Sequence, residues 1–192
     1  MENLLPLIYL AILLLVLFTL ASTVAQQVIK RQQVEKELST ILNTIKQDKA
    51  TAQDYYNLGT IYLSKKLYDQ AILQFRYALK TWNFEDSTGL SNLYNTIGFT
   101  YFETQQYELA IYYYEEALKI NDSYVVALNN LAYAQEKQGN INIAVDLYQK
   151  VLRFDSSNMT AIDRLQTLQR RYLKSGWQDL NLRHPAPKAG AL

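Results

Sequence analysis

The stretch YYNLGTIYL, residues 55–63, decides the fold, because it recurs as YNTIGFTYF at residues 94–102. In both copies a tyrosine, an aliphatic residue, a glycine and a second tyrosine hold the same places. A weaker third copy begins at Leu128, where Ala132 replaces the glycine and Gln135 replaces the second tyrosine. Residues spaced by three and four positions share one face of an α-helix, so each copy predicts one helix.

A second pattern follows each copy and predicts a second helix. It pairs an alanine with an aromatic residue four positions later, as in Ala71 and Phe75, Ala110 and Tyr114, and Ala144 and Tyr148. The interval between the first and second of these alanines is a few residues longer than the interval between the second and third. The extra residues predict a loop at EDSTG, residues 85–89. The short connections KKL, QQ and QGN predict antiparallel helix hairpins.

This double pattern resembles the tetratricopeptide repeat, a unit of about 34 residues that folds as helix–turn–helix. The resemblance predicts an all-α chain, with repeats at residues 52–85, 91–124 and 125–158 stacked into a solenoid. Small residues let the two helices of a pair approach closely, and each pair buries its second face on the next. The helically spaced Ile162, Leu165 and Leu168 predict a capping helix at 159–174. Tyr114 is expected in the core, with Tyr112 and Tyr113 beside it between helices or on the outer side.

Residues 4–25, LLPLIYLAILLLVLFTLASTVA, carry no charge and predict a transmembrane anchor. About 22 residues at ~1.5 Å each give a helix of roughly 33 Å, enough for a hydrocarbon core of about 30 Å. No Lys or Arg precedes this segment, whereas Lys30, Arg31 and Lys36 follow it. The positive-inside rule therefore places the rest of the chain on the cytoplasmic or stromal side. The alternative is a signal peptide cleaved after Ala25.

Residues 26–51 predict a basic linker helix. An apolar stripe runs along it, made of Val34, Leu38, Ile41 and Ile45. We expect the stripe to dock on the first repeat, and the alternative is a coiled-coil seam that joins two copies of the chain.

Composition and motifs argue against catalysis. The chain has no cysteine and one histidine, His184, and it lacks glycine-rich phosphate loops and the common hydrolase and metalloprotease motifs. We therefore expect no enzyme activity, no cofactor, no metal site and no small-molecule substrate. A net charge of +1 without a basic run argues against nucleic acid as a partner.

The first helix of each repeat is expected to line an inner groove. Helical register places ten residues there: Tyr56, Asn57, Thr60, Asn92, Asn95, Thr96, Phe99, Asn129, Asn130 and Tyr133. Asparagine amides can pair with the N–H and C=O of an extended peptide, and aromatic rings can cover its apolar side chains. We expect this neutral groove to bind protein segments with little dependence on salt, with Asn95 and Asn129 outside the contacts between helices. The alternative is that these asparagines form solvated helix faces.

The anchor LLPLIYLAILLLVLF, the linker VIKRQQVEKELS and the repeats starting at YYNLGTIYL together resemble a known family. They resemble the small photosystem I assembly proteins with tetratricopeptide repeats of cyanobacteria and algal plastids, over residues 1–173. The resemblance implies a single-pass thylakoid membrane protein with its repeats on the stromal or cytoplasmic side. Its partners would be photosystem I subunits or assembly factors. The alternative is a bacterial envelope adaptor for secretion, translocation or another membrane complex.

Residues 175–192, SGWQDLNLRHPAPKAGAL, break the helical periodicity and hold two of the three prolines. We predict a disordered tail. Its sequence resembles a peptide made when a reading frame runs through a neighbouring transfer-RNA gene, and we assign His184 no role.

Overall fold

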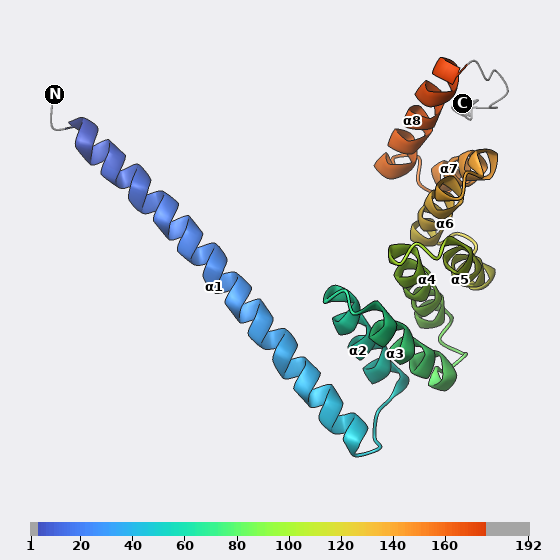
Figure 1. Cartoon of the computed structure of the whole chain (residues 1–192), viewed down its shortest axis with the longest axis horizontal. Coiled ribbons are helices and arrows are strands. Elements are labelled where there is room, and N and C mark those ends of the chain that lie inside the picture. The colour runs from blue at the N-terminus through green and yellow to red at the C-terminus, as the bar shows by residue number, and fades with distance from the viewer. Residues whose placement is uncertain (1–3, 176–192) are drawn as a thin grey trace, which may run out of the picture. The chain divides into compact units, whose positions relative to one another are not determined.

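The computed structural model describes residues 4–175, and every regular element in that range is a helix. This confirms the all-α prediction. The chain divides between Ala50 and Thr51 into two compact units. One is built on a single long helix and the other on a series of short ones (Figure 1).

The first unit is helix α1, Leu4–Lys46, which runs unbroken for 43 residues. The predicted anchor and most of the predicted linker are therefore parts of one helix. Its most apolar window has a mean hydropathy of 2.6 with none of it buried, so by length and composition α1 can cross a membrane. The helix ends at Lys46, and Asp48 adopts a left-handed φ of 56°. Residues 47–51 thus form a turn and a cap where linker helix was expected.

The second unit contains three helix pairs and a last single helix, in chain order (Figure 1). Each pair packs closely and contacts the next. The helices are α2 (Ala52–Ser64) and α3 (Tyr68–Thr81), α4 (Ser87–Glu103) and α5 (Tyr107–Ile120), α6 (Val125–Lys137) and α7 (Ile141–Phe154), and α8 (Met159–Ser175).

The glycines of the repeated pattern lie where the two helices of a pair meet. A Cβ atom built on Gly59 would clash with Cε1 of Phe75, and one built on Gly98 would lie 2.8 Å from the ring of Tyr114. Both rings are almost completely buried. Each aromatic side chain of the second helix therefore occupies the space that the glycine leaves free, and the two halves of the sequence pattern fit together as one contact.

The residues inserted between the first two repeats do not form the loop predicted at 85–89. Helix α4 begins at Ser87, and the Asp86 carboxylate caps it by accepting a hydrogen bond of 2.9 Å from the Gly89 amide. A carboxylate at this position satisfies an amide that has no partner within the helix, which stabilises an extra turn. Helix α4 is accordingly 17 residues long, whereas α2 has 13. Only residues 82–86 connect α3 to α4.

The three consecutive tyrosines of α5 take three different environments. Tyr114 is buried in the core, as predicted. Tyr113 stacks on Tyr101 of α4, with ring centroids 5.4 Å apart, and the exposed Tyr112 meets Tyr113 edge-on at 5.1 Å. Burial raises the pKa of Tyr113, so this phenol stays neutral, and its ring packs between α4 and α5.

Two sequence predictions concern a contact between the two units and the C-terminal tail. Docking of the residue 34–45 stripe on the first repeat, and its coiled-coil alternative, stay predictions. The tail prediction falls on residues 176–192, outside the described range, while Ser175 is the last residue of α8.

Candidate partner-binding face

The ten predicted groove residues lie on α2, α4 and α6, on the side that we call the inner face. These are the first helices of the three pairs, and α4 contacts α6 directly. The structure distributes the ten residues between two roles. Some make contacts between successive repeats, and the others lie at the surface of the inner face.

Tyr56 belongs to the junction between the first and second repeats. Its ring lies 5.9 Å from that of Phe75 and 6.0 Å from that of the buried Trp82. Its hydroxyl is 3.4 Å from the Thr96 hydroxyl on α4. Tyr56 is therefore half-buried, and its contacts stabilise the packing of the first repeat on the second.

The asparagines form ties between successive repeats, which overturns the expectation that Asn95 and Asn129 lie outside the contacts between helices. The Asn130 amide donates a hydrogen bond of 3.0 Å to Oδ1 of Asn95, whose side chain is buried. The Asn129 amide donates one of 3.2 Å to Asn158, just before α8. Oδ1 of Asn129 is buried without a hydrogen-bond partner among the described residues. The Asn130 amide points back to the preceding repeat, and the Asn129 amide points forward to the residue before α8.

The remaining small polar residues bond within their own helices. Asn57 accepts a hydrogen bond of 2.7 Å from Gln53, and the Thr60 hydroxyl donates to the Asn57 carbonyl. The Thr96 hydroxyl donates to the carbonyl of Asn92, whose side chain is exposed. These groups remain at the surface of the inner face, where a partner could replace water.

Phe99 and Tyr133 supply the aromatic part of the inner face. They are separated by one repeat length and so hold equivalent positions on α4 and α6. Phe99 is 39% exposed. Val126 on α6 is 51% exposed and lies seven residues before Tyr133, which is two helical turns along the same side. Together Phe99, Val126 and Tyr133 form what we call the apolar bed.

Charged residues that sequence reasoning missed surround Tyr133. The Lys137 ammonium lies 5.1 Å from the centre of the Tyr133 ring, and the Arg164 guanidinium lies 5.0 Å from it. Arg164 also binds the Glu136 carboxylate, with 3.1 Å between Nε and Oε2. Lys137 is four residues after Tyr133, and Arg164 follows Asn130 by one repeat length. The helix period and the repeat length could therefore have placed both on this face.

The described residues contain no group of three His, Cys, Asp or Glu side chains that could hold a metal ion. The chemistry that this face offers is that of a binding surface, with amides, hydroxyls, aromatic rings and two cations.

The sequence model of the tetratricopeptide-repeat family matches residues 48–123 and 89–157. The chain is 44% identical over 174 residues to the ycf37 protein of Guillardia theta, covering 91% of this chain and 98% of that protein. It is 29% identical over 163 residues to PYG7 of Arabidopsis thaliana, a chloroplast protein with a tetratricopeptide repeat domain, covering 85% of this chain and 54% of that protein. The crystal structure of MamA has the same fold, with a TM-score of 0.66 and 19% identity, over 78% of this chain and 83% of that one.

Proposed function

The chain belongs to the tetratricopeptide-repeat proteins and, among them, to the ycf37 family, and on that premise we propose that it is a membrane-anchored, non-enzymatic scaffold for photosystem I. It binds segments of photosystem I subunits or assembly factors on the inner face. In doing so it helps the complex assemble or stay assembled.

The apolar bed is the observation that supports binding on this face. Phe99, Val126 and Tyr133 line up on two helices that touch each other, while most of the neighbouring amides are used in ties between repeats. Folding alone gains nothing from leaving Phe99 and Val126 exposed, whereas a partner that covers them removes apolar surface from water. Full burial of an exposed side chain of this size contributes about 1.5–3 kcal/mol, and Phe99 and Val126, which are 39% and 51% exposed, would each contribute roughly half of that or less.

Helix α1 supports the location. It is apolar and uncharged over residues 4–25, and its basic residues begin at Lys30, so it fits a single crossing with the repeats on the stromal or cytoplasmic side. The chloroplast relative from Arabidopsis thaliana fits a plastid membrane. The thylakoid membrane and photosystem I are proposed from the family resemblance of the anchor, linker and repeats.

The experiment that tests this function is purification of the tagged full-length protein from detergent-solubilised thylakoids of an alga, followed by identification of the photosystem I subunits that come with it. Phe99→Ser removes the most exposed aromatic side chain of the inner face. Tyr112→Ser is the matched control, because Tyr112 is 52% exposed but lies on α5.

We expect photosystem I subunits with the wild type and with Tyr112→Ser, and few or none with Phe99→Ser. Equal recovery with all three proteins would move the binding site away from the inner face. Recovery of a different membrane complex in place of photosystem I would favour the envelope-adaptor alternative.

A further inference from the structure

Two cations lie close to the Tyr133 ring, and only one of them has an acidic partner. Arg164 donates from two nitrogens to the carboxylate of Glu136, whose side chain is only 6% exposed. Burial lowers the pKa of Arg164, but the hydrogen bond and the charge of Glu136 outweigh that effect and raise it overall. Arg164 and Glu136 thus form a fixed, neutral pair that holds α6 against α8.

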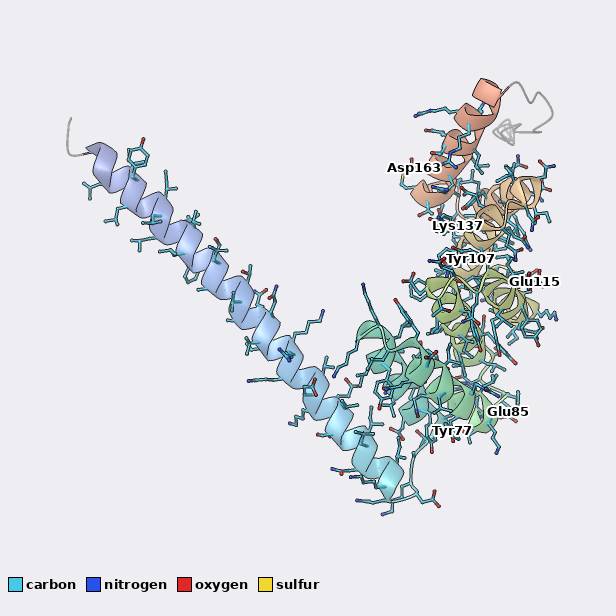
Figure 2. All side chains as sticks on the ribbon, viewed as in Figure 1. Tyr77, Glu85, Tyr107, Glu115, Lys137 and Asp163 are labelled. Carbon is cyan, nitrogen blue, oxygen red and sulfur yellow. The ribbon has the colours of Figure 1, made fainter. Side chains whose placement is uncertain are left out.

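Lys137 is the second of the two cations beside Tyr133. It is exposed at the end of α6 (Figure 2). Its ammonium is close to the Tyr133 ring but has no acidic partner within the described part of the chain. A cation beside an aromatic ring, with no anion bound to it, is suited to receive a carboxylate from outside.

The charges along one edge of the inner face change sign from one end of the stack to the other. Glu103, Lys137 and Arg171 follow one another at intervals of one repeat length, so they hold equivalent positions on α4, α6 and α8. All three are exposed. Asp163 is the nearby acid on α8 (Figure 2), but it lies one residue away from Arg164 and so about 100° around the helix. The edge is therefore acidic at α4 and basic at α6 and α8.

We propose, resting on the function proposed above, that the inner face receives an extended protein segment in which an acidic side chain adjoins an apolar or aromatic one. The apolar side chain covers Phe99, which holds the position on α4 that Tyr133 holds on α6, and the carboxylate lies beside Lys137, one turn after Tyr133, at the α6–α8 end. Because Glu103 repels an acid at the α4 end, the charge order fixes the direction in which the segment lies. Binding therefore weakens as salt rises, whereas the sequence predicts little dependence on salt.

The test uses the full-length protein in detergent and three labelled synthetic peptides, followed by fluorescence anisotropy. One peptide has a leucine and a phenylalanine with two glutamates on one side of them, and its two twins carry glutamines or lysines in place of the glutamates. The variants are Lys137→Gln, Lys137→Glu and Phe99→Ser. Lys80→Gln is the matched control, because Lys80 is an exposed lysine on α3, outside the inner face.

We expect the glutamate peptide to bind most tightly and the lysine peptide least. Lys137→Gln should weaken binding of the glutamate peptide by about two- to fivefold and reduce its salt dependence. Lys137→Glu should weaken it by about tenfold or more, and Lys80→Gln should leave it unchanged.

Equal affinities for the three peptides, or equal effects of Lys137→Gln and Lys80→Gln, would overturn this inference. If Phe99→Ser still abolishes binding in that case, the inner face remains the binding site and only the charge preference is wrong. Absence of binding by all three peptides would also overturn the inference, while co-purification of photosystem I subunits tests the proposed function separately.

Discussion

Replacing Asn130 by alanine should destabilise the repeat unit more than replacing Asn95, although the two side chains share one hydrogen bond of 3.0 Å. The asymmetry comes from burial. Asn95 is 9% exposed, so loss of Asn130 leaves a buried oxygen without its donor. Asn130 is only half-buried, so after loss of Asn95 its amide can turn to water.

The magnitudes follow from that difference. An unsatisfied buried acceptor costs about 1–3 kcal/mol, whereas loss of a hydrogen bond whose surviving partner is hydrated costs about 0.5–1.5 kcal/mol. The double variant buries no unpaired amide oxygen at this position, so its loss should fall short of the sum of the single losses by about 1 kcal/mol.

The assay is urea unfolding of residues 51–175, followed by far-UV circular dichroism, with thermal melting as a second measurement. In a unit of this size each 1 kcal/mol moves the melting temperature by roughly 3–6 °C. Equal losses for the two single variants, or a double variant whose loss equals their sum, would show that the amide tie does not hold α4 to α6. Any binding experiment on the inner face should therefore use Phe99 and leave these asparagines intact.

Three further results are expected of the same unit. Gly98→Ala gains about 1 kcal/mol of helix propensity, but its Cβ would lie 2.8 Å from the Tyr114 ring, which costs about 1–3 kcal/mol in overpacking. The free energy of unfolding in urea should therefore fall. A more stable variant would mean that α4 and α5 can separate without cost. Gln105→Gly should raise the melting temperature, because φ is 61° at this residue and relief of left-handed strain favours glycine by up to about 1 kcal/mol; a lower melting temperature would contradict this. Hydrogen bonds from Asn158 and Ser157 lower the pKa of Asp155 in the folded protein below its usual 3.8. The stability that its carboxylate contributes is therefore present above pH 3.8 and is lost as the pH falls through the pKa of the folded state. Melting temperatures between mildly acidic and strongly acidic pH should therefore fall more for the wild type than for Asp155→Asn, and parallel curves would refute the assignment.

The fold was predictable because its signals are local and repeated. A small residue on one helix and an aromatic residue on the next, as at Gly98 and Tyr114, encode a single contact, and three occurrences, the third with Ala132 in place of glycine, leave few alternatives. The loop expected at residues 85–89 failed for a local reason as well. Asp86 can end a loop or begin a helix, and only the capping hydrogen bond to Gly89 shows which occurs.

The inner face was harder to predict, because helical register gives the direction of a side chain but not what lies within its reach. Asn95 and Thr96 are adjacent on α4, and both were expected to face a partner. The structure brings α6 beside Asn95, so that its amide oxygen accepts from Asn130. The charges beside Tyr133 lie outside the neutral set of amides that register predicts, although Lys137 and Arg164 stand at positions that the helix period and the repeat length identify.

The use of amides inside the stack has a consequence for binding. Ties such as the one between Asn130 and Asn95 fix the spacing of the repeats, so a partner meets a preorganised surface and loses less free energy in ordering it. What remains for recognition is a short apolar bed and an edge whose charge changes sign, which by themselves support only modest affinity. Helix α1 compensates for this. Beyond residue 25 it continues as helix to Lys46, about 30 Å at ~1.5 Å per residue, and so forms a stiff tether. If α1 crosses the membrane that holds the partner complex, both are confined near one surface, and the raised effective concentration lets weak contacts suffice for binding that can still be released.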